Sequence, residues 1–218
     1  MREDLTVIYF TSNREKPEFE HRIQQTLLDT IDGLPVVSVS HKPMDFGTNI
    51  CVGEHEPTTF NAIRQIQLGA MEAKTPFICL AESDFLYPKE YFDFMPSNIN
   101  TAYVATPVYI LFAQRGKAKV FATKKGNCES VLVAGRECLI SAIDKMLYGR
   151  DMWGDDPFLY FVHLLKLMNH ETFKMSIPAM TFKTDGNMHR KAPIHRDSFC
   201  REIPYWGDSA SLIRKYMS

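Results

Sequence analysis

The first half of the chain alternates between short apolar runs and helical repeats. Leu5 to Thr11 is rich in β-branched and aromatic residues, which favours a strand. Pro17 to Ile31 carries apolar residues at helical spacing and is followed by the helix stop Asp32-Gly33. Pro35 to Ser40 predicts a second strand. Strands that alternate with helices are typical of α/β domains, so the pattern predicts a mostly parallel central sheet flanked by helices.

The run from Phe77 to Ala81 is apolar at every position, which indicates a strand covered on both faces of such a sheet. Glu82 and Asp84 come directly after it. While the strand continues, residues two apart point to one side, so the two carboxylates could bind one divalent cation together with phosphate oxygens. The alternative is local: Ser83 or Asp84 caps a short helix that is entered through Pro88.

The other segments complete the predicted order. Thr58 or Thr59 begins the helix before the central strand, and Lys42 to Pro57 has no clear period, which is typical of a loop. Further along we expect a helical turn over Tyr91 to Met95, a strand over Tyr103 to Ala113 bent at Pro107, an edge strand over Lys117 to Thr123, a helix opened by Gly135, a helix opened by Trp153 with Asp156 as N-cap and Pro157 at its first position, a strand over Phe173 to Lys183, and a basic, mostly irregular tail.

Composition narrows the class of protein. At 218 residues, of which 45% are apolar and 23% charged, the chain is long enough for one sizeable domain. The five cysteines are widely spaced and odd in number, so we expect free thiols rather than disulfides or a zinc site. No apolar run is long enough to span a bilayer, and the first residues lack a signal peptide, so a cytoplasmic protein is expected. The formal net charge of −1 gives no overall attraction to nucleic acid.

Three landmarks occur in order along the first 95 residues. Thr11-Ser12-Asn13-Arg14-Glu15 follows the first strand, Gly69 and Ala73 lie on the helix before the central strand, and Glu82-Ser83-Asp84 ends that strand. Together they resemble the GT-A glycosyltransferases, particularly the large family that includes many bacterial and phage sugar transferases. The resemblance implies a single Rossmann-like GT-A domain over residues 1–218. Residues 1–95 would bind a nucleotide sugar, and residues 96–218 would bind the acceptor and carry the basic tail.

The resemblance also implies roles for particular residues. Glu82 and Asp84 fall where the family has an Asp-x-Asp motif that holds Mn²⁺ or Mg²⁺ against the donor diphosphate, with His189 as a late ligand and His195 as its alternative. Glu82 replaces the usual first aspartate, and Gln67 stands where the helix usually has asparagine. The residues expected to bind the donor are Thr11, Asn13, Arg14, His41, Ser83 and Arg190.

His41 follows the second strand, where the family often has a base-binding aspartate, so the nucleotide stays open. An inverting transferase also needs a base that takes the proton of the acceptor hydroxyl. Trp153-Gly154-Asp155-Asp156 resembles the acceptor-side segment in which the family places that base, so Asp155 and Asp156 are the catalytic candidates. Asp156 before Pro157 is also a good capping sequence, which favours Asp155 as the base.

Three functional hypotheses follow. The first is a metal-dependent, inverting glycosyltransferase whose acceptor is a modified DNA base or a glycan. The second is a nucleotidyltransferase of related fold, although Ser12 to Pro17 lacks the glycine-rich loop that such enzymes use. The third is a non-catalytic nucleotide- or nucleic-acid-binding module. DNA would suit two basic clusters, which contain Arg190, Lys191, Arg196 and Arg201, and Arg115, Lys117, Lys119, Lys124 and Lys125.

Overall fold

The structure is a computed structural model that describes residues 2–114, 119–125, 128–156, 158–184 and 199–217. Its strands are β1 (Leu5–Thr11), β2 (Val36–Ser40), β3 (Thr48–Cys51), β4 (Phe77–Glu82), β5 (Phe85–Leu86), β6 (Thr101–Gln114), β7 (Lys119–Lys125), β8 (Leu132–Gly135), β9 (Asn169–Lys183), β10 (Phe199–Cys200), β11 (Glu202–Ile203) and β12 (Gly207–Asp208). Its helices are α1 (Pro17–Ile31), α2 (Thr59–Glu72), α3 (Lys89–Asp93), α4 (Arg136–Met146), α5 (Phe161–Leu165) and α6 (Ser209–Met217), and a 3₁₀ turn covers Glu129–Val131.

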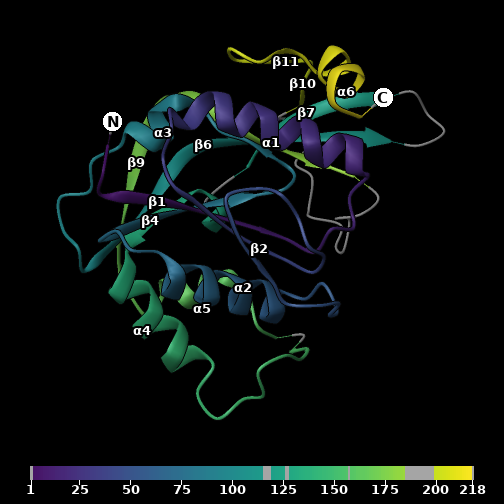
Figure 1. Cartoon of the computed structure of the whole chain (residues 1–218). Coiled ribbons are helices and arrows are strands. Elements are labelled where there is room, and N and C mark those ends of the chain that lie inside the picture. The colour runs from purple at the N-terminus through teal and green to yellow at the C-terminus, as the bar shows by residue number, and fades with distance from the viewer. Residues whose placement is uncertain (1, 115–118, 126–127, 157, 185–198, 218) are drawn as a thin grey trace.

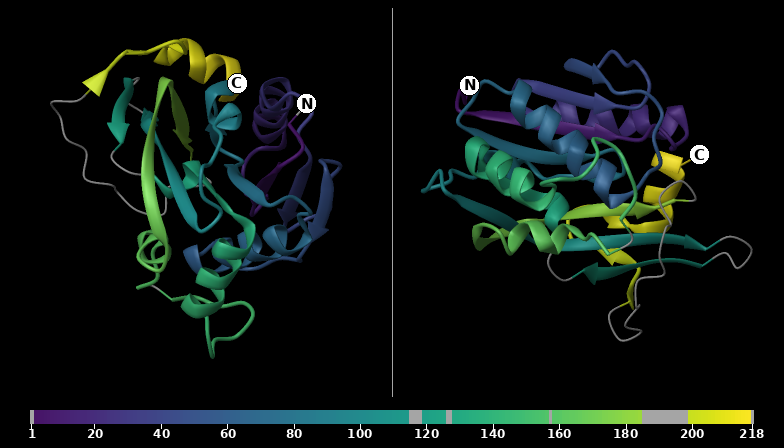
Figure 2. Two further views of the ribbon diagram at one scale, coloured as in Figure 1. Left: turned by 90° about the vertical axis from the view of Figure 1, so that its left-hand side faces the viewer. Right: turned by 90° about the horizontal axis from the view of Figure 1, so that it is seen from below.

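Within the described residues, ten strands form one sheet in the order β10-β7-β6-β8-β4-β1-β2-β3, and β9 pairs with both β5 and β6. Helices α1 and α3 lie on one side of this sheet, and α2, α4 and α5 lie on the other (Figure 1). Two further views show α2 and α4 next to each other across one face (Figure 2). The predicted α/β class, with a central sheet between helices, is confirmed.

The half of the sheet that holds β3, β2, β1 and β4 is parallel, so the carboxyl ends of these strands meet at one edge. Thr11 at the end of β1 pairs with Ser40, and Phe10 pairs with Glu82 at the end of β4. The chain passes from β1 to β2 and β3 on one side, and then returns through α2 to β4 on the other side of β1. Ligands of open α/β sheets bind at such a switch in strand order, which here lies between β1 and β4.

The other half of the sheet is mixed. β8 is antiparallel to both β4 and β6, whereas the long β9 runs parallel to β6. The predicted bend at Pro107 coincides with a shift of register between Thr106 and Val108, because proline has no N–H to donate to the ladder. The turn after β4 folds back as β5, which pairs with the end of β9. The second half of the chain therefore reaches the carboxyl edge of the parallel half.

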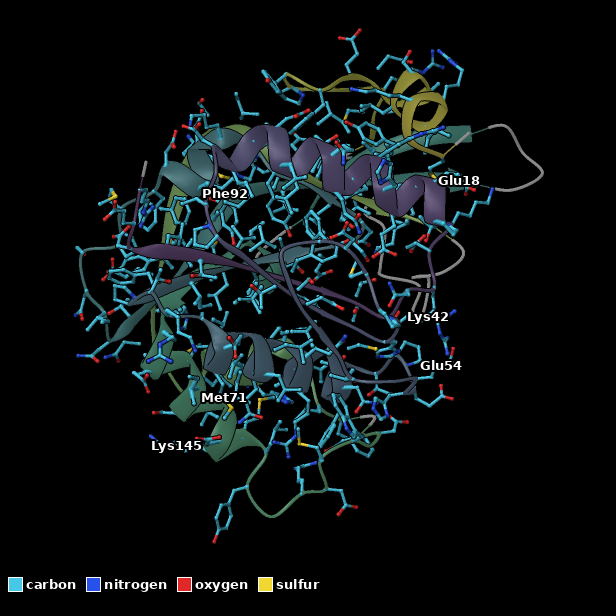
Figure 3. The ribbon with its side chains drawn as sticks, viewed as in Figure 1. Glu18, Lys42, Glu54, Met71, Phe92 and Lys145 are labelled. Carbon is cyan, nitrogen blue, oxygen red and sulfur yellow. The ribbon has the colours of Figure 1, made fainter. Side chains whose placement is uncertain are left out.

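Helix α2 packs closely against β1 and β2. A Cβ on Gly69 would lie 2.5 Å from Cγ2 of Ile8 and 3.2 Å from Cγ2 of Val39. Ile8 and Val39 are fully buried, as is Phe92 of α3 on the other side of the sheet (Figure 3). Because Gly69 has no side chain, α2 can lie close to the strands, and close packing explains why this position is a glycine.

Several predicted boundaries need correction. The loop expected from Lys42 to Pro57 contains the edge strand β3, which becomes a strand by pairing with β2. The helix expected from Trp153, with Asp156 as its N-cap, begins instead at Phe161. Asp156 caps a turn there, since its Oδ1 accepts the N–H of Phe158 at 2.9 Å.

The expected irregular tail is also wrong in its last part, because the chain ends in α6. Leu212 and Tyr216 of α6 are buried in a cluster with Phe19 and Ile23 of α1 and Phe182 of β9. The hydroxyl groups of Thr26 and Tyr216 lie 3.1 Å apart across the two helices. Among the described residues, no helix has the length and apolarity needed to cross a membrane.

Candidate functional site

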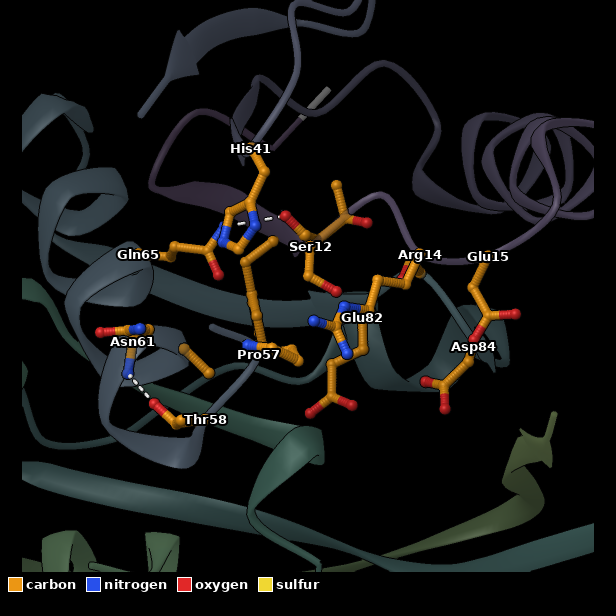
Figure 4. Close-up of a pocket in the computed structure, with 14 residues that line it drawn as sticks. Ser12, Arg14, Glu15, His41, Pro57, Thr58, Asn61, Gln65, Glu82 and Asp84 are labelled. Atoms are coloured by element: carbon orange, nitrogen blue, oxygen red, sulfur yellow. Dashed lines mark hydrogen bonds between the residues drawn. The ribbon is translucent and has the colours of Figure 1, made fainter. Parts of the chain in front are cut away.

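A pocket opens at the carboxyl ends of β1 and β4, at the switch in strand order (Figure 4). Its walls come from the ends of β1, β2 and β4, the loop after β1 and the first turns of α2. The residues that line it are Phe10, Thr11, Ser12, Arg14, Glu15, His41, Pro57, Thr58, Asn61, Ala62, Gln65, Glu82, Ser83 and Asp84. Five of the six donor-binding candidates lie in the described residues, and four of these, Thr11, Arg14, His41 and Ser83, line the pocket.

Glu82 and Asp84 both line the pocket, and their carboxylates project in the same direction in Figure 4. The geometry differs from the expected continuous strand, because β4 ends at Glu82 and Ser83-Asp84 form a turn. Asp84 is only 5% exposed, and its Oδ2 accepts the hydroxyl of Thr181 in β9 at 3.1 Å. The local alternative is wrong for α3, whose N-cap residue is Pro88 and which has no side-chain cap.

Glu15 and Glu20 extend the acidic character of this edge. Oε1 of Glu15 accepts the hydroxyl of Thr184, just beyond β9, at 2.6 Å, and Oε1 of Glu20 accepts the hydroxyl of Tyr9 at 3.0 Å. Burial raises the pKa of Glu15, and the neighbouring Asp84 and Glu20 raise it further. Burial also raises the pKa of Glu20. Added negative charge is therefore unfavourable here unless a cation or proton accompanies it.

Hydrogen bonds of Thr11 and Asn13 hold the conformation of the loop after β1. Thr11 Oγ1 accepts the N–H of Asn13, and Asn13 Oδ1 accepts the N–H of Lys42 at 2.9 Å, which ties this loop to the one after β2. Asn13 adopts a left-handed conformation, with φ of 50°, and lines an adjoining hollow rather than the pocket. Ser12, Arg14 and His41 line both spaces, and the ion pair of Lys42 with Glu54 borders the hollow (Figure 3).

His41 is buried where β2 ends, and its Nε2 has no hydrogen-bond partner among the described residues. Burial lowers the pKa of His41, and the nearby His55 and Arg14 lower it further. The ring is therefore neutral near pH 7 and presents nitrogen atoms that can donate or accept one hydrogen bond each.

Two residues that the sequence interpretation missed, Asn61 and Gln65, lie one turn apart on the pocket face of α2. Both are buried. The amide of Gln65 donates to the carbonyl oxygens of Thr11 at 2.8 Å and Val39 at 3.1 Å, so it bridges the diverging ends of β1 and β2. Polar residues spaced by four on an otherwise apolar helix face are the signal that could have found them.

The segment Trp153 to Asp156 is attached to the rim of the pocket. The N–H of Gly154 donates to Asn61 Oδ1 at 2.9 Å, and the carbonyl of Gly154 accepts the hydroxyl of Thr58 at 3.0 Å. The ring of Trp153 stacks on His55, with centroids 4.0 Å apart. The two catalytic candidates, Asp155 and Asp156, follow this attachment directly.

The two aspartates differ in their contacts. Asp156 forms an ion pair with Arg150 and accepts a backbone N–H, and the hydrogen bond from Arg150 holds its pKa below the usual range. Asp155 is exposed, and within the described residues it has no hydrogen bond or ion pair. The structure thus gives Asp156 a structural role in its loop and leaves the carboxylate of Asp155 open to solvent.

No group of three histidine, cysteine, aspartate or glutamate side chains in the described part of the chain is arranged to hold a metal ion. Glu82 and Asp84 therefore offer a two-carboxylate set. Such a set fits Mg²⁺ or Mn²⁺, which typically keep several waters and bind through one or two carboxylates plus substrate phosphates. His189, its alternative His195 and Arg190 lie outside the described residues, as does most of the two basic clusters. Lys119, Lys124, Lys125 and Arg201 are described, and Lys124 and Arg201 are exposed.

No protein-family model matches the sequence, and no curated protein sequence matches it. Solved structures match its fold. The inositol-1-phosphate CTP transferase from T. maritima is 11% identical with a TM-score of 0.54, covering 85% of this chain and 92% of that one. S. aureus TarS 1-349 in complex with UDP-GlcNAc is 11% identical with a TM-score of 0.52, covering 88% of this chain and 62% of that one. The bifunctional IspDF from Campylobacter jejuni is 10% identical with a TM-score of 0.46, covering 79% and 50%.

This chain thus spans 50% of the length of the IspDF chain and 62% of the TarS chain. The likeness to structures with TM-scores above 0.5 shows a GT-A-like, Rossmann-type fold, in agreement with the fold that the sequence predicts.

Proposed function

We propose that this chain is a metal-dependent glycosyltransferase that moves a sugar from a nucleotide-sugar donor to an acceptor hydroxyl. The observation that carries the proposal is the charge of the pocket. Three carboxyl groups, from Glu15, Glu82 and Asp84, face the single guanidinium of Arg14 among the lining residues. A diphosphate would be repelled from such a pocket unless a cation entered with it. A nucleoside diphosphate that enters with a divalent cation would avoid this repulsion, because the cation balances the negative charge of both the carboxylates and the phosphates.

In this proposal, different residues bind different parts of the nucleotide-sugar donor. Glu82 and Asp84 would hold the cation, which would supply positive charge to the diphosphate as it leaves. Arg14 and the N-terminus of α2, which begins at the pocket wall beside Thr58, add positive potential toward the phosphates. The neutral ring of His41 offers a hydrogen bond to the nucleobase. The pocket wall between the phosphate and base positions is formed by Ser83, Thr11 and Gln65.

In the chemical step, Asp155 receives the proton of the acceptor hydroxyl. The acceptor oxygen forms a bond to the anomeric carbon as the bond from that carbon to the diphosphate oxygen breaks, and the bonding electron pair leaves with the diphosphate. The acceptor proton passes to the carboxylate of Asp155 as general base, and the product has inverted stereochemistry. Asp155 suits this role because it follows the Gly154 attachment to the pocket rim and is not engaged by Arg150, as Asp156 is.

A nucleotidyltransferase is the second candidate, since the T. maritima CTP transferase matches over 92% of its own chain. That reaction would consume a nucleoside triphosphate and release pyrophosphate. The loop from Ser12 to Pro17 contains no glycine to wrap a triphosphate, which favours the glycosyltransferase.

Product analysis separates these functions. The protein is incubated with Mn²⁺, a mixture of oligosaccharides and sugar phosphates as acceptors, and either a panel of nucleotide sugars or a panel of nucleoside triphosphates, and released nucleoside diphosphate and pyrophosphate are quantified. We expect nucleoside diphosphate from a nucleotide sugar, at a rate lowered at least 100-fold by Asp84→Asn. Pyrophosphate release from a triphosphate would establish the second candidate. No release from either panel, or full activity of Asp84→Asn, would reject the metal-dependent transferase.

A further inference from the structure

The loop between α4 and α5, residues 147–160, exposes large apolar side chains and is attached to the pocket rim at Gly154. Tyr148 is 89% exposed and Phe158 is 77% exposed, and Met152 and Tyr160 are exposed as well. Four of the eleven large apolar side chains found exposed in the described residues therefore belong to this one loop. Exposed apolar side chains that gather in one part of a surface can mark a binding site.

Hydrogen bonds to α2 and to Thr58 hold this loop in place. Gly154 is bonded through both its N–H and its carbonyl to Asn61 and Thr58 at the pocket rim. At its start, the guanidinium of Arg64 donates to the carbonyl oxygens of Arg150 and Asp151 at 3.5 and 3.0 Å. These bonds fix the middle of the loop, from Arg150 to Gly154, against α2, and they fix Gly154 at the pocket rim.

The charge of the loop limits what it can bind. Residues 147–160 contain one basic residue, Arg150, and three acidic ones, Asp151, Asp155 and Asp156, so their formal charge is −2. The single cation is already paired with Asp156. With Arg64 of α2, which is bonded to the loop, the formal charge of this surface is still −1. Nucleic acids are bound mainly by lysine and arginine at their phosphates, so this surface does not favour them.

We propose that this loop binds a neutral carbohydrate, which is the acceptor of the transferase. The inference rests on the proposed function and names its acceptor class. A sugar ring has apolar C–H faces that pack on exposed aromatic rings such as that of Phe158, and it has hydroxyl groups that donate to carboxylates. Asp155 then both recognises the acceptor hydroxyl and receives its proton. The combination of aromatic rings, free carboxylate and absence of free cations matches a neutral glycan and not DNA.

The chain has a built-in reporter for this surface. It contains two tryptophans, Trp153 in the loop and Trp206, which is bonded to the carbonyl of Pro178. A Trp206→Phe variant leaves Trp153 as the only tryptophan. Its fluorescence is followed while the protein, saturated with Mn²⁺ and a nucleoside diphosphate, is titrated with neutral oligosaccharides chosen from a glycan array, with a sulfated polysaccharide and with double-stranded DNA.

The matched variants are Phe158→Ser and Tyr205→Ser. Tyr205 is 73% exposed in the turn between β11 and β12, at the top of Figure 1, whereas the loop after α4 lies at the bottom. We expect at least one neutral glycan to bind saturably, with affinity at least tenfold weaker in Phe158→Ser and unchanged in Tyr205→Ser. Binding of DNA or the sulfated polysaccharide in preference, binding of no neutral glycan, or equal affinities of the two variants would overturn the proposal.

The melting temperature with nucleoside diphosphate and Mn²⁺ is measured on the same samples. Glycan binding without any response to the nucleotide would reject the transferase while leaving the carbohydrate surface standing. A nucleotide response without glycan binding would reject the acceptor class alone.

Discussion

Glu15, Glu20 and Asp84 bring three carboxyl groups to one edge of the sheet, each held by a hydroxyl donor. Burial raises the pKa of Glu15 and Glu20, so their ionised forms are disfavoured in the folded protein. Proteins keep unfavourable charges of this kind mainly where function needs them. At the residue scale, the carboxyl groups at this edge support the proposal that a cation enters the pocket together with the donor.

The substitution Glu20→Gln tests this at a residue that does not line the pocket. Because the pKa of Glu20 is raised by folding, its stabilising contribution is complete below its ordinary value of about 4.5 and is lost as pH rises through the folded value. A neutral amide removes that loss. We expect the melting temperature to rise at pH 8, by about 2–4 °C if the gain is about 1 kcal/mol, and to change little at pH 4.

Thermal melts of wild type and Glu20→Gln between pH 4 and pH 8 measure this difference. A variant that is less stable at pH 8, by more than at pH 4, would show that the carboxylate is favourable where it lies.

At the scale of elements, α2 connects the core to the pocket. Its Gly69 lets it approach β1 and β2, while Asn61 and Gln65 bond the rim loop and the strand ends. A shift of this helix by a fraction of an ångström would move both contacts. The spacing of α2 from the sheet should therefore affect stability and the site together.

Gly69→Ala places a methyl group 2.5 Å from Cγ2 of the fully buried Ile8. Although alanine favours helix, we expect this overpacking to dominate and to lower the free energy of unfolding by about 1–3 kcal/mol, as read from urea denaturation. Met71→Ala, at an exposed position on the same helix, is the control and should change stability by less than about 0.5 kcal/mol. Equal stability of Gly69→Ala and wild type would mean that the helix is not closely packed there.

Elements with a strong local signal could be predicted from the sequence, and those made by tertiary contacts could not. β1, α1 and β2 match their predicted ranges to within one residue, because apolar periodicity and the Asp32-Gly33 stop define them locally. β3 was missed because Thr48–Cys51 becomes a strand only by pairing with β2. The helix expected from Trp153 was wrong because Asp156 has the local pattern of an N-cap, while in the structure it accepts the N–H of Phe158 and the helix begins at Phe161; Pro157 lies outside the described residues.

Some residues of the candidate site could be predicted from the sequence and others could not. Glu82, Ser83 and Asp84 were found because they interrupt a buried run, and the pocket does form beside them. Asn61 and Gln65 were missed although their spacing by four on an apolar helix face is a signal, and Thr184 gave none, since its contact with Glu15 depends on how β9 packs against the loop after β1.

At the scale of the whole molecule, the two halves of the chain meet at the carboxylates. Asp84 from the first half is bonded to Thr181, and Glu15 to Thr184, at the end of β9 in the second half. β5 extends this seam by pairing with the same strand. A cation at Asp84 would therefore stabilise the junction between the halves as well as bind a nucleotide.

Thr181→Val keeps the side-chain shape but removes the hydroxyl that donates to Asp84. Because both residues are buried, we expect a loss of about 1–3 kcal/mol in the free energy of unfolding without metal. Thr101→Val, also buried but at the start of β6, is the comparison. If Thr181→Val matches wild type in chemical denaturation, the bond across the seam does not stabilise the fold.

The measurement that tests the account most directly is the melting temperature of the protein with each common nucleoside diphosphate, with and without Mn²⁺, in wild type and in Asp84→Asn. A ligand at 100 times its Kd stabilises the folded state by about 2.7 kcal/mol, which corresponds to about 5–10 °C for a chain of this length. We predict such a shift for at least one nucleoside diphosphate, dependent on Mn²⁺ and absent in Asp84→Asn. No shift with any of them, or an equal shift without Mn²⁺ and in the variant, would contradict a cation-dependent nucleotide site between β1 and β4.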